Sequence, residues 1–196
     1  MVGCERGNKE IAGCRVSLYP MSDQFITLLS KSIKTNRLDA VWSDTDLFST
    51  LYRGKQESVV DAAAGLFVRT YRPEVHSVCE LTFSKGCPGD VAQDYVFNNE
   101  NPTPNSRFIS QYGNFTVQCK YSFYAFGITN YMNEIAEVVT LAKKRNLYEG
   151  STHYVTILEG TAAELFAYFE EVLAYADEHI EHYVLEATLS VNSPSK

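Results

Sequence analysis

Residues 76–84 (His-Ser-Val-Cys-Glu-Leu-Thr-Phe-Ser) and residues 182–190 (His-Tyr-Val-Leu-Glu-Ala-Thr-Leu-Ser) share one alternating pattern. A period of two is typical of a strand with two unlike faces. Every second residue (His, Val, Glu, Thr and Ser) is identical in the two runs, whereas from Cys79 and Leu185 onward the intervening residues are merely apolar. Because a core face accepts swaps between similar apolar residues, the conserved polar face indicates a site that is present twice.

The correspondence covers most of the chain, at an offset of 105 residues early (124 − 19) and 106 later (182 − 76). In each copy a strand pattern is followed by apolar residues at helical spacing, two short strand patterns, a second amphipathic stretch and the duplicated strand. The first helix pattern contains Phe25, Ile26, Leu29 and Ile33 in one copy and Tyr131, Met132, Ile135 and Val139 in the other. The expected hairpins are at 41–45 with 47–53 and at 147–151 with 154–159.

This order predicts an α+β fold made of two tandem ferredoxin-like βαββαβ repeats with antiparallel sheets. We expect a first repeat at 10–86, a connecting segment at 87–117 and a second repeat at 118–196. The connecting segment is rich in Asn, Pro and Gly, which predicts turns and loop. Two roles remain open for it, since it either crosses from one repeat to the other over a surface or covers a site.

In such a repeat the first and last strands are central neighbours and the helices cover one face, toward which Val16, Leu18, Cys79, Leu81 and Phe83 should point. The opposite face would carry hydroxyls, a phenol and a carboxylate, which can orient a small polar heterocycle by hydrogen bonds. The candidate ligand-binding residues are Ser17, Tyr19, Thr50, Glu80, Thr82 and Ser84, with Ser122, Tyr124, Thr156, Glu186, Thr188 and Ser190 in the second copy. The alternatives are a polar face left in water and one packed on a second chain.

Charge and composition exclude several classes of function. A net charge of −7 over 196 residues argues against nucleic acid or an anionic membrane as partner. The N-terminal stretch is polar and no apolar run approaches the roughly 20 residues of a membrane span, so we expect a cytoplasmic protein. The five cysteines show no CxxC spacing, and Cys14, Cys79 and Cys119 are expected to be small buried hydrophobes.

The chain has no Gly-rich phosphate loop, GxSxG elbow or HExxH motif. The sequence therefore predicts no catalytic residue, no metal site and no cofactor.

Three stretches resemble the bacterial YkoF family: Ser-Leu-Tyr-Pro-Met at 17–21, Ser-Thr-Leu-Tyr-Arg-Gly at 49–54 and Thr-Phe-Ser-Lys-Gly-Cys-Pro-Gly-Asp at 82–90. The ending Leu-Ser-Val-Asn-Ser-Pro-Ser at 189–195 is also similar. The resemblance implies binding of thiamin or its hydroxymethylpyrimidine part, one site per repeat, a homodimer, and a role in thiamin or pyrimidine uptake without a reaction.

The expected function is therefore non-catalytic binding of a small molecule. The second copy has Thr152 where the first has Asp46, which suggests unequal affinities at the two sites. The alternative is a regulatory or assembly module whose polar sheet face binds protein, either itself or a transporter subunit.

Overall fold

A computed structural model describes residues 10–85 and 100–195 of the chain. The last part of the Thr82–Asp90 motif (residues 86–90), together with Cys4 and Asn98, lies outside the described residues. Both predicted repeats are present as complete βαββαβ units, so the predicted fold class is confirmed. The first repeat consists of β1 (Ala12–Pro20), α1 (Phe25–Thr35), β2 (Val41–Thr45), β3 (Thr50–Gly54), α2 (Gln56–Thr70) and β4 (Ser77–Lys85). The second consists of β5 (Thr116–Phe126), α4 (Tyr131–Lys144), β6 (Tyr148–Thr152), β7 (Val155–Thr161), α5 (Ala162–His179) and β8 (His182–Val191).

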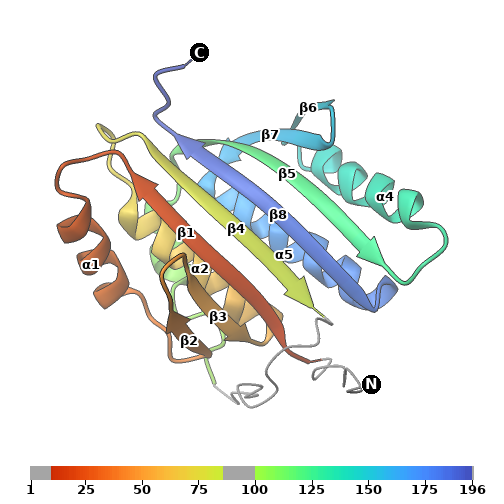
Figure 1. The fold of residues 1–196 in the computed structure, drawn as a ribbon, viewed down its shortest axis with the longest axis horizontal. Coiled ribbons are helices and arrows are strands. Elements are labelled where there is room, and N and C mark those ends of the chain that lie inside the picture. Colours follow the sequence, from red (N-terminus) through yellow and green to blue (C-terminus); the bar gives the residue numbers. More distant parts are fainter. Residues whose placement is uncertain (1–9, 86–99, 196) are drawn as a thin grey trace.

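The strands of both repeats form one antiparallel sheet in the order β2-β3-β1-β4-β8-β5-β7-β6 (Figure 1). The duplicated strands β4 and β8 are the pair that joins the two halves, with Ser77 opposite Val191 and Lys85 opposite Tyr183. The sequence predicted an antiparallel sheet in each repeat, but not that the two would join into a single sheet. Its consequence is that the two copies of the Glu-x-Thr run lie side by side at the centre of the sheet.

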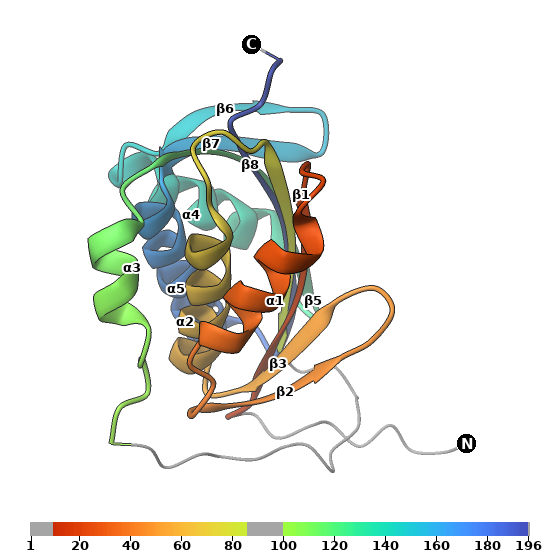
Figure 2. The same ribbon diagram turned by 90° about the vertical axis from the view of Figure 1, so that its left-hand side faces the viewer.

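In the part of the chain that the structure describes, the helices lie on one face of the sheet and no helix covers the other face (Figure 2). The apolar residues of the central strands point into this helix-covered side, where Val16, Cys79 and Leu81 are 3% exposed or less. Cys14, Cys79 and Cys119 are buried free thiols, and burial raises the pKa of each. The prediction that these cysteines are small buried hydrophobes is confirmed.

The first helix of each repeat leaves part of its predicted apolar stripe exposed. In α1, Phe25 is 47% and Ile26 is 67% exposed, whereas the buried residues are Leu28 and Ser32. Their counterparts at the start of α4, Tyr131 and Met132, are also exposed. Each repeat therefore presents apolar side chains at the same place in its fold.

The described part of the connecting segment runs over the helical layer and contains α3 (Ser106–Tyr112), so turns and loop were the wrong prediction there (Figure 2). Asn105, which is fully buried, anchors it. The backbone N–H and Nδ2 of Asn105 donate to Asp61 Oδ2 at 3.0 and 2.8 Å. Nδ2 also donates to the Arg37 carbonyl at 2.9 Å, and the Arg37 N–H donates back to Asn105 Oδ1 at 3.1 Å. This part of the segment crosses a surface on the side away from the polar face.

Within residues 10–85 and 100–195, no helix is long and apolar enough to cross a membrane.

Candidate functional site

The two Glu-x-Thr runs meet across the junction between β4 and β8. Glu80 stands opposite Thr188, and Thr82 stands opposite Glu186. Directly opposed residues of an antiparallel pair share a face, with Cβ atoms about 4.5–5.5 Å apart. Two carboxylates and two threonine hydroxyls therefore form one central cluster, to which both repeats contribute equally.

This cluster lines a hollow of about 330 Å³ that extends toward the second repeat. That volume lies at the lower end of the range for small-molecule pockets, about 300–1,000 Å³. Its lining residues are Glu80, Leu81, Thr82, Lys120, Tyr121, Ser122, Val155, Glu186, Ala187 and Thr188. Five of the twelve predicted ligand-binding residues, namely Glu80, Thr82, Ser122, Glu186 and Thr188, are among them.

Each hairpin loop is fastened to the polar face by a serine of the neighbouring strand. The Ser17 hydroxyl donates to the Phe48 carbonyl at 3.0 Å, and the Ser122 hydroxyl donates to the Tyr154 carbonyl at 3.0 Å. Figure 2 shows the β2–β3 hairpin reaching out on the side opposite the helices. Both serines thus use their proton to hold a loop, which leaves their oxygen lone pairs for a ligand.

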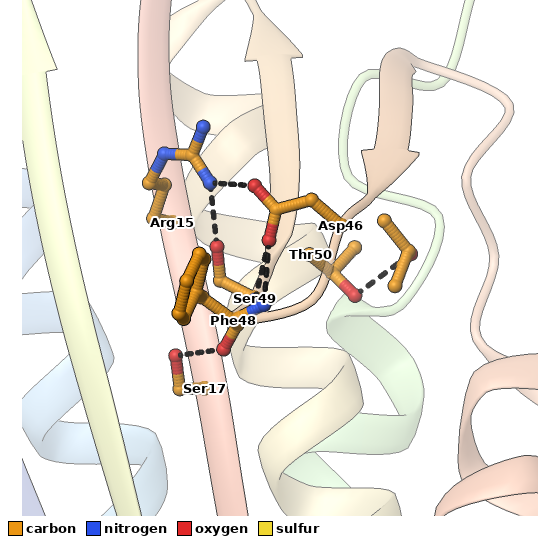
Figure 3. A network of polar contacts seen from close by, with 7 residues as sticks. Arg15, Ser17, Asp46, Phe48, Ser49 and Thr50 are labelled. Carbon is orange, nitrogen blue, oxygen red and sulfur yellow. Dashed lines mark hydrogen bonds and ion pairs between the residues drawn. The ribbon is translucent and has the colours of Figure 1, made fainter.

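Charged groups reinforce the first loop (Figure 3). Arg15 Nη1 donates to Asp46 Oδ2 and to Ser49 Oγ, both at 2.7 Å. Asp46 Oδ1 in turn accepts from the Phe48 and Ser49 amides at 2.8 and 2.9 Å. The hydrogen bond from Arg15, followed by those from the two amides, lowers the pKa of Asp46 from 3.8 to about 2. The loop around Phe48 is therefore fixed by an ionic network at any ordinary pH.

The remaining predicted residues of the polar face lie around the cluster. The Tyr19 hydroxyl donates to Glu80 Oε2 at 3.1 Å, while its counterpart Tyr124 is 45% exposed. Ser190 Oγ lies 3.3 Å from His76 Nε2. The Ser84 hydroxyl is buried without a hydrogen-bond partner among the residues that the structure describes.

The structure does not bring Thr50 and Thr156 to this face. Thr50 stands opposite Val16 and Thr156 opposite Tyr121, and both Val16 and Tyr121 are buried in the core. The two threonines are themselves only 9% and 8% exposed. In β3 the large Tyr52 occupies the core side, and because strand side chains alternate, Thr50 two residues earlier shares that side.

Lys120 and Val155 line the hollow although they were not among the candidate residues. The sequence could have identified Lys120 as a candidate, since it matches Arg15 at the offset of 105 residues and lies on the predicted polar face. No sequence pattern identified Val155 as a candidate, because its position depends on how the β6–β7 hairpin folds over the sheet. Within residues 10–85 and 100–195, no three His, Cys, Asp or Glu side chains gather as a metal site.

Residues 11–90 and 116–196 match the model of the YKOF-related family, one match for each repeat. The chain is also 34% identical over 190 residues to a protein of Bacillus subtilis (strain 168) named "Putative HMP/thiamine-binding protein YkoF". The alignment covers 97% of this chain and 94% of that relative.

Proposed function

The chain belongs to the YkoF-related family, and on that premise we propose that it binds thiamin or its hydroxymethylpyrimidine moiety noncovalently on the polar sheet face. It releases the ligand unchanged, and it needs no cofactor. The observation that carries the proposal is the central cluster of Glu80, Thr82, Glu186 and Thr188 at the wall of the hollow.

The chemistry of the ligand fits these groups. An aminopyrimidine offers a donor amine and acceptor ring nitrogens, which a carboxylate and a hydroxyl meet with directional hydrogen bonds. The thiazolium ring of thiamin is a cation, and the carboxylate of Glu186, which has no ion pair among the described residues, attracts it. A few such contacts on a partly exposed face, after the cost of immobilising the ligand, favour micromolar affinity over nanomolar affinity.

We place one site in each repeat, with the sites sharing the central cluster as a common wall. Each half contributes a glutamate, a threonine and a loop-fastening serine, which are Glu80, Thr82 and Ser17 in the first half. The same proposal includes a cytoplasmic location and a role in thiamin or pyrimidine uptake.

The proposed assembly is a homodimer. Its support is apolar surface at equivalent places of the two repeats, since Met21 and Ile26 are 61% and 67% exposed, and Phe126 and Met132 are 44% and 60% exposed. Exposed apolar surface is typical of contacts between proteins.

Calorimetric titration with thiamin and with hydroxymethylpyrimidine tests the proposal. We expect saturable heat at micromolar to submillimolar ligand, and recovery of chemically unaltered ligand by mass spectrometry after long incubation. The absence of heat with both ligands at millimolar concentration would refute it. Sedimentation velocity measures the oligomeric state separately. A monomer would refute the proposed homodimer but would leave the proposed ligand binding unaffected.

A second candidate function is an assembly module whose polar face binds protein. It is favoured by Leu47, Phe48 and Tyr154 at the loop tips on that face, which are 95%, 81% and 96% exposed. Under this alternative the Leu47→Ser and Tyr154→Ser variants lose the dimer in sedimentation, whereas under small-molecule binding they keep it.

A further inference from the structure

The two halves of the polar face differ in the hydrogen-bond and ion-pair partners that their charged side chains have within the protein. In the first half, Arg15 is held by Asp46 and Ser49, both at 2.7 Å. The carboxylate of Glu80 in the same half accepts a hydrogen bond from the Tyr19 hydroxyl at 3.1 Å. Arg15 and Glu80 therefore each have a partner within the protein.

In the second half the corresponding basic residue is Lys120, and the two residues that hold Arg15 are replaced. Thr152 stands where the first half has Asp46 (152 − 46 = 106), and Val155 stands where it has Ser49 (155 − 49 = 106). Neither replacement carries a charge, and Val155 has no polar side-chain atom. The second loop therefore offers no counter-ion to Lys120.

Lys120 and Glu186 are both unengaged. Within the part of the chain that the structure describes, neither side chain has an ion pair or a hydrogen bond, and both line the hollow. They lie on adjacent strands, where Lys120 stands opposite Thr188 and Glu186 stands opposite Ser122. Neighbours on a diagonal are within reach of long side chains, yet these two do not pair.

We propose that Lys120 determines specificity, and that the second half-site takes a ligand that carries an anionic group, a phosphate monoester, at the end opposite its amine. This inference rests on the proposed function. Glu186 holds the amine end and Lys120 holds the phosphate, which carries about −1.5 to −2 charges at neutral pH. With Glu80 and Glu186 on the remaining wall, the hollow repels an anion everywhere except at Lys120, which fixes the orientation of the ligand.

The net charge of −7 makes such a preference informative. A negative protein repels a phosphate ester in general, so tighter binding of the phosphorylated ligand requires a local cation. Arg15 donates through Nη1 to Asp46 and Ser49 and does not line the hollow, so among the described residues Lys120 is the cation of the hollow that is available to a ligand.

The experiment compares thiamin with thiamin monophosphate by calorimetric titration of the full chain at low salt. We expect the monophosphate to bind about three- to fivefold more tightly, as for an ion pair that remains accessible to water, and the difference to shrink in 0.5 M NaCl. Lys120→Gln should remove the preference and Lys120→Arg should keep it. Lys31→Gln removes the same charge from α1, outside the hollow, and should leave the preference as in the wild type.

Equal affinities of the wild type for the two ligands, or a preference that survives Lys120→Gln, would overturn this inference while thiamin binding stands. Failure of both ligands to bind would overturn the proposed function and this inference with it. Circular dichroism of each variant verifies that it is folded.

Discussion

Gly65 permits the connecting segment to lie against α2, and replacing it with alanine tests that packing. A Cβ at this position would lie 2.5 Å from Asn36 Oδ1 and 2.7 Å from Asn105 Cγ. Real Cβ atoms essentially never approach another heavy atom closer than 3.0 Å. One of the two asparagine side chains must therefore move, and both are engaged in buried hydrogen bonds.

One stabilising and two destabilising effects determine how much Gly65→Ala changes the free energy of unfolding. A Gly→Ala change within a helix stabilises by about 1 kcal/mol through helix propensity alone. Displacing Asn105 leaves the buried groups that it pairs unsatisfied, which costs about 1–3 kcal/mol. Overpacking typically costs a further ~1–3 kcal/mol. We expect Gly65→Ala to lower the free energy of unfolding by about 2–3 kcal/mol, with the sign opposite to that of propensity.

Urea denaturation followed by circular dichroism measures this change, with Gly13→Ala in β1 as a control for a Cβ added without a close contact. A Cβ at Gly13 would meet its nearest atom at 3.7 Å, which is ordinary van der Waals contact. The control should stay within about 1 kcal/mol of the wild type. A Gly65→Ala variant as stable as the wild type, or more stable, would refute the close packing of Asn36 and Asn105 on α2.

Three further predictions concern the charged groups. Glu186→Gln should weaken thiamin binding about fivefold in calorimetry, as expected for loss of one partly exposed charged contact. The control Glu149→Gln, on the edge strand β6, should leave the affinity unchanged, and equal effects of the two substitutions would contradict the proposed site. Burial raises the folded-state pKa of Asp61, so the stability of the wild type should fall relative to that of Asp61→Asn as the pH rises above 3.8. Urea denaturation at several pH values measures this difference, and parallel stability curves for the two proteins would contradict the raised pKa. The pKa of Asp46 is lowered to about 2, so its network should stabilise the folded state fully above pH 3.8 and lose this effect as the pH falls through about 2. An NMR titration of the Asp46 carboxyl carbon measures this pKa, and a midpoint near 3.8 would contradict the Arg15 contact.

Much of the fold is readable from the chain because the duplication marks each element twice. The alternation of Val16, Cys79 and Leu81 with polar residues identified the buried face of the central strands correctly. The identity of Glu and Thr in both copies indicated the polar face, which the pairing of β4 with β8 concentrates into one cluster. A period of two fixes which residues share a face, so these inferences needed only local pattern.

Other features depend on tertiary packing that no local pattern encodes. The choice of β8 as the partner of β4 is a long-range pairing. The face on which Thr50 lies is decided by the burial of Tyr52, and an alternating Thr-Leu-Tyr-Arg run allows either phase. The exposure of Phe25 and Ile26 likewise depends on how much of α1 the sheet covers. Local apolar spacing predicts a helix but not how much of its stripe the rest of the protein buries.

The central claim is that the polar face around the β4–β8 junction holds the ligand, and amide chemical shifts test it directly. Titration of isotope-labelled protein with hydroxymethylpyrimidine should shift the backbone amides around Glu80, Thr82, Glu186 and Thr188 first, at concentrations near the dissociation constant. Shifts confined to the helical layer around α2 and α5, or no shifts at millimolar ligand, would contradict the account.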